Sequence, residues 1–188
     1  MKDKENSSEI QPLRPIEWVE VISIPLEQSF NFDYVRREMI SARLPKKILP
    51  EQINSSSIRE FSMDRKDREQ FALGVQLFNE GEYWHAHEAW EAVWRRHCEE
   101  ERLFLQGIIQ LAAAYHLIIK KERYGGALRN FEKARAKLSV FPTKFFGLNV
   151  QMMLKSIEHG VHELQSLGEE RIAEFNRSSI PILTIDEK

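Results

Sequence analysis

The sequence contains few cysteines and no long apolar segment of the kind found in signal peptides or membrane-spanning helices. Of its 188 residues one is a cysteine, Cys98. A single cysteine cannot form a disulfide within the chain, and such usage is typical of a reducing compartment. No apolar run near the N-terminus has secretory length, and none approaches the roughly 20 apolar residues of a membrane span. We therefore expect a cytoplasmic protein with no membrane partner.

The chain also lacks an excess of either charge and the common short catalytic motifs. Lys and Arg number 27 against 29 Asp and Glu, a formal net charge of -2, so no basic field predicts a nucleic-acid partner. The sequence contains no Gly-rich phosphate loop, nucleophile elbow or CxxC pair. The chain is long enough to form one domain with a single hydrophobic core. Such a domain buries roughly 70% of the surface that the unfolded chain exposes.

Proline and serine divide the chain into an arm, a core and a tail. Residues 1–60 form the predicted N-terminal arm, with a short strand over 16–24, a helix over 31–43 and a linker over 45–62. Residues 61–168 form the core domain. The tail, residues 169–188, is predicted to be weakly structured, although residues 180–185 have the composition of an edge strand that could pair with the strand of the arm.

Helical spacing of apolar residues runs through the core, so we predict an all-α, compact antiparallel bundle. Ser62 or Asp64 is placed to cap the first helix and Asn149 the last, and Gly81 fits a left-handed turn. Gly125 and Gly126 are expected to break the third helix from the fourth. The five helices are predicted over residues 64–78, 82–97, 100–121, 126–140 and 150–167.

The first two helices carry small and aromatic residues at the offsets of a tetratricopeptide-type helix pair. Gly74 and Ala86 would let two helices approach, and Trp90 would fill the gap between them. Gly107 begins a degenerate second copy, longer by about two turns. Two pairs and a fifth helix are too few for an extended solenoid.

The second helix has a polar edge beside its aromatic residues. At about 100° per residue, His87 and Glu91 lie one turn apart and about 40° apart, with Trp84 about 60° from His87 and Glu88 about 100° from it. Polar groups inside an apolar bundle need partners, because leaving them unpaired costs several kcal/mol. The neighbouring third helix offers them. We therefore predict one polar ligand pocket lined by His87, Glu91, Gln106, Gln110, His116, Trp84 and Trp90, with Arg102 at its mouth.

The same residues permit a metal site. His87-Glu88-Ala89-Trp90-Glu91 is the H-E-x-x-H pattern with its second histidine replaced by glutamate. His87 and Glu91 could ligate a divalent metal and Glu88 could act as the catalytic general base. The third ligand is not supplied by the sequence. A hydrogen-bonded cluster that fixes helix register explains the residues more simply.

The order of these motifs resembles a known family. The residues that carry the likeness include Gly74, Gly81 and Tyr83, the run 86–94 and the run 106–116. Over about residues 71–167 they resemble the DUF309 family, small all-helical prokaryotic domains of unknown function. The resemblance implies an all-α bundle in which His87, Glu88, Glu91, Gln106, Gln110 and His116 belong to the signature, and it implies no activity or cofactor.

Two functions remain open from the sequence. One is a non-catalytic module that binds a small molecule or a protein partner; the other is a metal-dependent, hydrolase-like enzyme. The first needs only satisfied polar groups, whereas the second also needs a third ligand and an open coordination position. A homodimer is left open as well, since the arm could pack on its own core or on a second copy.

Overall fold

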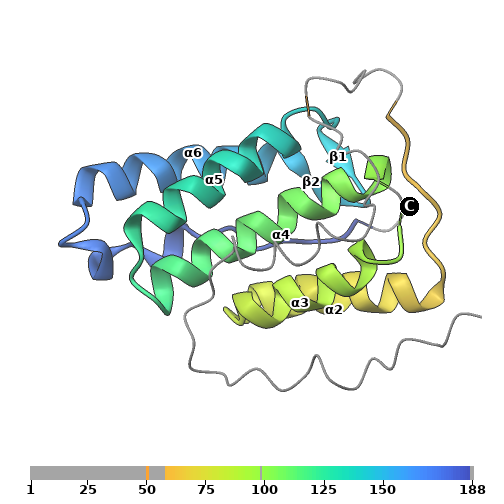
Figure 1. Cartoon of the computed structure of the whole chain (residues 1–188), viewed down its shortest axis with the longest axis horizontal. Helices are drawn as coiled ribbons and strands as arrows, with labels where there is room; N and C mark the ends of the chain where they lie inside the picture. Colours follow the sequence, from red (N-terminus) through yellow and green to blue (C-terminus); the bar gives the residue numbers. More distant parts are fainter. Residues whose placement is uncertain (1–49, 51–57, 98, 187–188) are drawn as a thin grey trace, which may run out of the picture. The chain divides into compact units, whose positions relative to one another are not determined.

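The computed structural model describes residues 50, 58–97 and 99–186, all within the compact unit Pro45–Lys188. The described part is mostly helical, as predicted (Figure 1). Its elements are α2 (Arg65–Asn79), α3 (Tyr83–Trp94), α4 (Glu99–Ile119), α5 (Tyr124–Leu138), β1 (Lys144–Phe145), β2 (Leu148–Asn149), α6 (Val150–Leu167), η5 (Ile172–Glu174) and η6 (Arg177–Ser179). The predicted all-α fold of antiparallel helix pairs is confirmed.

Local sequence signals explain where the helices begin and turn. The Asp64 side chain accepts from the Asp67 amide at the start of α2, and Asn149 accepts from the Met152 amide at the start of α6. Gly81 has φ of 80°, which allows α3 to fold back against α2 after a short turn. These caps and this turn are the ones that the sequence predicts.

Helix α4 lies between α3 on one side and α5 on the other (Figure 1). Its residues Phe104, Ile108, Leu111 and Tyr115 are buried, as the main apolar line of this helix predicts. Arg102–Ile119 is one window of the described residues that is long and apolar enough to cross a membrane, with mean hydropathy 1.4, and 67% of it is buried inside the protein. Burial of this kind is also the mark of the central helix of a bundle.

The turn between α4 and α5 differs from the prediction. Gly125 and Gly126 do not separate α4 from α5 but lie in the first turn of α5. The chain reverses over residues 120–123, where Glu122 takes a left-handed conformation with φ of 50°. A Cβ at Gly126 would approach Leu117 Cδ1 to 3.1 Å, so this glycine permits close packing of the two helices rather than a helix break.

A small hairpin precedes α6 and was not anticipated by the helical pattern. Strands β1 and β2 pair antiparallel, with Phe145 opposite Leu148. Phe145 and Leu148 are both buried in the core, whereas Gly147 in the turn has φ of 75°. Two residues per strand give too short an alternation to be recognised in a sequence.

The prediction of a weakly structured tail is wrong for the apolar residues of 169–186. Ile172, Phe175 and Leu183 are buried and belong to the hydrophobic core. Residues 181–186 have no regular secondary structure, so no strand forms over this part of the described chain. The other half of the predicted pairing, residues 16–24, lies outside the described residues, as do the helix over 31–43, most of the linker over 45–62 and Cys98.

Candidate functional site

Trp84 and His87 pack together on the edge of α3. Their rings stack in parallel, with centroids 4.9 Å apart and planes inclined by 14°. His87 is only 6% exposed, while Trp84 is half-buried. The two residues are three positions apart, the spacing at which side chains of one helix meet. The indole therefore covers one face of a buried imidazole.

His116 of α4 meets the same indole. The centroids of Trp84 and His116 are 5.5 Å apart and their planes are inclined by 49°. Trp84 thus contacts two imidazoles that come from different helices. We call Trp84, His87 and His116 the indole–imidazole cluster. It brings together three residues that the sequence predicts for one pocket.

The environment of His87 favours its neutral form. Burial is the main cause that lowers the pKa of His87, and the charge of Arg95 lowers it further. The carboxylates of Glu91 and Glu88 act in the opposite direction but do not offset the burial. The neutral imidazole has one donor and one acceptor nitrogen, so it can take part in two different hydrogen bonds.

His116 is held neutral by a different set of charges. Partial burial is the main cause that lowers the pKa of His116, and Lys121, His87 and Lys120 lower it further. Glu82 opposes them. Because the pKa of each histidine is lowered from its usual value, two neutral imidazoles are the favoured state near pH 7.

The two glutamates of the predicted site lie on the outer side of the cluster. Glu91 has a side chain 28% exposed, and its carboxylate is 3.2 Å from the Arg95 guanidinium one turn later. Glu88 is exposed. Both affect His87 electrostatically, but each is open to water, which weakens such pairs.

The two glutamines of α4 lie elsewhere on that helix. Gln110 accepts a hydrogen bond from Lys137 Nζ of α5 at 3.0 Å, and Gln106 is half-buried one turn earlier. Lys137 is 8% exposed, and the sequence analysis did not select it. Its position in the sequence, between the inner-face residues Ala134 and Leu138, could have indicated that this lysine is buried. Gln110 therefore bridges α4 to α5, whereas His116 bridges α4 to α3.

Arg102 holds the end of α3 together. Its Nε donates to the Trp94 carbonyl at 2.9 Å and its Nη2 to the Arg95 carbonyl at 3.2 Å. The guanidinium also lies 4.5 Å from the centre of the Trp94 ring. These contacts satisfy carbonyls that a helix end leaves unpaired and favour a cation there. Arg102 thus acts as a cap in addition to any contact with a ligand.

Trp90 lies on the face of α3 that packs on α2. It is fully buried, and its Nε1 donates to the Phe71 carbonyl of α2 at 3.1 Å. Gly74 makes room for the indole, as the helix-pair offsets predict. Trp90 therefore joins α2 to α3 in the core.

No three His, Cys, Asp or Glu side chains converge on a point where they could hold a metal, within residues 58–97 and 102–186. His87 and Glu91 therefore gain no third protein ligand from the part of the chain that is described. That His87 and Glu91 of the H-E-x-x-E pattern ligate a metal stays a prediction, and Glu88 is exposed. Nothing in this geometry favours the metal-dependent reading over the binding reading.

A second polar cluster joins the start of α2 to the residues after α3. The buried Asp67 carboxylate accepts from Arg96 and lies 2.9 Å from His97 Nε2. Burial alone would raise the pKa of Asp67, but the hydrogen bonds and charges of Arg96 and His97 hold it below its usual value. The same carboxylate lies in the first turn of α2, where a helix favours a negative charge. This cluster is a structural link between two helix ends.

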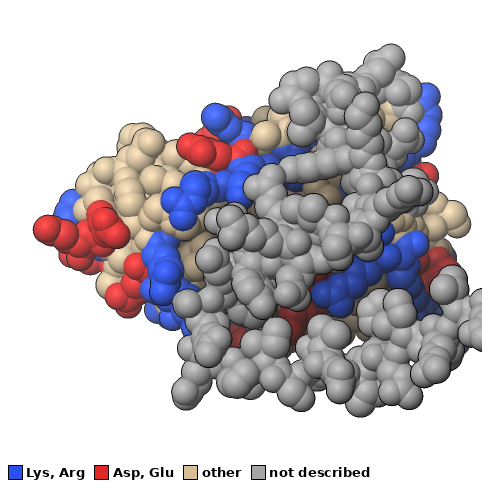
Figure 2. Space-filling view, in the orientation of Figure 1, with Lys and Arg blue, Asp and Glu red and all other residues tan. Residues whose placement is uncertain are grey.

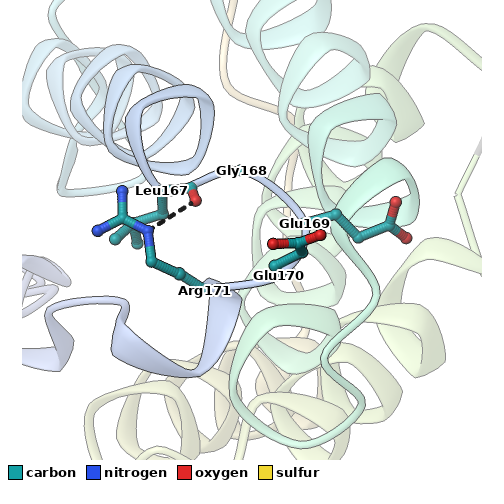
Figure 3. A pocket seen from close by; sticks show the side chains of 5 residues that line it. All are labelled: Leu167, Gly168, Glu169, Glu170 and Arg171. Carbon is teal, nitrogen blue, oxygen red and sulfur yellow. Dashed lines mark hydrogen bonds between the residues drawn. The ribbon is translucent and has the colours of Figure 1, made fainter.

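The surface offers a hollow at the end of α6, formed by five consecutive residues, Leu167 to Arg171 (Figure 3). Arg171 turns back and donates to the Leu167 carbonyl at 3.3 Å, while Glu169 points away. The side chains come from a single turn and converge on no common point, so this hollow does not have the converging polar groups of a ligand-binding site. On the face drawn in Figure 2, basic and acidic side chains both occur among uncharged ones, and neither sign covers that face.

One family model matches part of the chain. Residues 71–130 match the family model described as a domain of unknown function, DUF309. The resemblance seen in the sequence is confirmed over this range, which holds the indole–imidazole cluster, both glutamates and both glutamines. No curated protein matches the chain.

Proposed function

We propose that the DUF309 domain of this chain is a non-catalytic binding module that holds a small, uncharged, planar ligand at the indole–imidazole cluster. The observation that carries the proposal is the contact of one indole with two imidazoles from different helices, at 4.9 Å and 5.5 Å. Ligand sites combine apolar walls with a few converging polar groups, and titratable groups with shifted pKa values gather there.

The cluster supplies the contacts that such a ligand needs. Trp84 offers an aromatic face, against which flat groups stack. His87 and His116 are neutral, because burial is the main cause that lowers the pKa of each. Neutral imidazoles donate and accept hydrogen bonds, which suits an amide or a heterocycle.

The surrounding charges argue against a strongly charged ligand. Glu88 and Glu91 act on His87, whereas Lys120 and Lys121 act on His116. An anion would meet the carboxylates near His87, and a cation would meet the ammonium groups near His116. A neutral ligand avoids both costs and needs no change in the protonation of the histidines.

Three probes that share one ring test this proposal: benzamide, benzoate and benzylamine, titrated at neutral pH and followed by the imidazole signals in NMR. Benzamide is expected to bind with a Kd of about 1–10 mM, the range for a fragment that gains about 0.3–0.5 kcal/mol per non-hydrogen atom. The two charged probes are expected to bind more weakly.

Matched variants locate the binding. Trp84→Ala and His116→Ala are expected to abolish the benzamide shifts, while His159→Ala, which removes an exposed imidazole of α6, leaves them unchanged. Circular dichroism checks that each variant is folded. The proposal fails if none of the three probes binds, or if Trp84→Ala binds benzamide as the unchanged protein does.

A further inference from the structure

The segment 180–186 is held through its backbone as well as through a buried side chain. Asn79, the last residue of α2, donates from Nδ2 to the Leu183 carbonyl at 2.7 Å and accepts from the Leu183 amide at 2.8 Å. The side-chain amide therefore pairs with both polar groups of one residue, as a neighbouring strand would. Such pairing does not depend on which side chain the extended residue carries.

One apolar side chain anchors the segment. Leu183 is 2% exposed and belongs to the core, whereas its neighbour Ile182 is 62% exposed. Thr184 and Ile185 are exposed too. A buried leucine flanked by exposed residues is the pattern of a short peptide in a binding site, where alternate side chains enter pockets.

An acidic residue completes the contact at the hairpin. The Asp186 amide donates to the Gly147 carbonyl at 3.1 Å, and its carboxylate pairs with Lys144. A Cβ at Gly147 would lie 2.9 Å from the Asp186 carbonyl oxygen, so the glycine lets the extended segment lie directly on the turn. The receptor surface thus consists of Asn79 and the hairpin residues Lys144 and Gly147.

From these contacts we propose that this surface is a peptide-binding site, and that residues 180–186 occupy it as an internal ligand that a partner protein displaces. The partner segment is extended and carries leucine followed three residues later by an acidic residue, since these are the groups that the site already holds. The hydrogen bonds and the ion pair described above for residues 183 and 186 involve none of Trp84, His87 and His116, so the inference stands independently of the proposed function.

The test uses the full chain with its internal ligand weakened. Leu183→Asp places a charge where the anchor is buried and is expected to free the site, while the control Ile182→Asp adds the same charge at an exposed neighbour. The probe is a labelled synthetic peptide with the sequence of residues 179–188, followed by fluorescence anisotropy. Because a tethered ligand competes at about millimolar effective concentration, we expect the peptide to bind Leu183→Asp at least about tenfold more tightly than the unchanged protein.

The contacts also fix the controls. A peptide with alanine in place of its leucine is expected not to bind, and Asn79→Ala added to Leu183→Asp is expected to abolish binding of the original peptide. Binding that is absent from folded Leu183→Asp, or equal for the two peptides, overturns the proposal. If Leu183→Asp does not fold, hydrogen exchange in the unchanged protein decides. Exchange of the Leu183 amide faster than that of the α4 core supports displacement, and exchange at the same rate overturns it.

Discussion

Replacement of Gly74 by alanine tests the close approach of α2 and α3 on which the bundle depends. A Cβ built at Gly74 would lie 2.3 Å from Trp90 Nε1 and 2.5 Å from Trp90 Cδ1. Real Cβ atoms do not approach ring atoms so closely, so the indole or the helix must move. Trp90 is fully buried and its Nε1 is hydrogen-bonded to the Phe71 carbonyl, so it has little room to do so.

Three effects set the size of the change in stability. Overpacking of a core costs about 1–3 kcal/mol. Loss of the buried hydrogen bond from Trp90 to Phe71 costs about 1–3 kcal/mol more. Alanine gains about 1 kcal/mol over glycine within a helix, which offsets part of the loss. We expect Gly74→Ala to lower the free energy of unfolding by about 3 kcal/mol.

Urea unfolding followed by circular dichroism measures this loss, with Gly125→Ala as the matched control. A Cβ at Gly125 has the end of the Arg129 side chain as its nearest contact, at 3.4 Å, which can move aside. The control is expected to be as stable as the unchanged protein or up to about 1 kcal/mol more stable. If Gly74→Ala equals the control, the tight packing of Trp90 on α2 is wrong.

Three further outcomes follow from the polar groups. Asp67→Asn should lower the free energy of unfolding by about 1–3 kcal/mol, because Arg96 and His97 lose a buried carboxylate, and an unchanged urea midpoint would contradict this. His87→Ala should cost about 1–3 kcal/mol, whereas Glu91→Gln should be mild because that side chain is partly exposed; equal losses in thermal melts would argue against a buried role for the histidine. Stability should also fall on acidification. The two histidines of the cluster have pKa values below 6.5 in the folded chain. Their contribution to the free energy of unfolding is therefore complete above pH 6.5 and is lost as the pH falls below that value. Urea unfolding at about pH 7.5 and about pH 5 measures the difference.

The helices could be predicted because their signals are local. Asn149 caps α6, Asp64 caps α2 and Gly81 turns the chain, each through contacts within a few residues. The turn before α5 could not be placed, because Glu122 takes the left-handed conformation that a glycine would be expected to take. The choice depends on how α5 packs on Leu117, which is a tertiary effect.

The sequence predicts which candidate residues share an edge of one helix, but not how the residues of different helices are arranged. Helical spacing places His87 and Glu91 on one edge of α3, but it does not say which face of α4 meets that edge. In the structure His116 turns to Trp84 of α3, whereas Gln110 turns to Lys137 of α5. Whether one ligand contacts all of these residues stays a prediction.

The contact between the tail and α2 had no local signal at all. Asn79 and Leu183 are 104 residues apart in the chain, and neither the asparagine at a helix end nor the leucine in an apolar run indicates the other. A side-chain amide that pairs with a distant backbone group is set by the packed fold, so sequence spacing cannot reveal it.

The direct test of the central claim is the titration of His87 and His116 by NMR, in the unchanged protein and in Trp84→Ala. Burial is the main cause that lowers both pKa values, so both histidines should titrate below 6.5 in the unchanged protein. Loss of the indole should admit water and raise both values toward 6.5. Two histidines that titrate at or above 6.5 in the unchanged protein, with no change in Trp84→Ala, would contradict the existence of a partly dry indole–imidazole site.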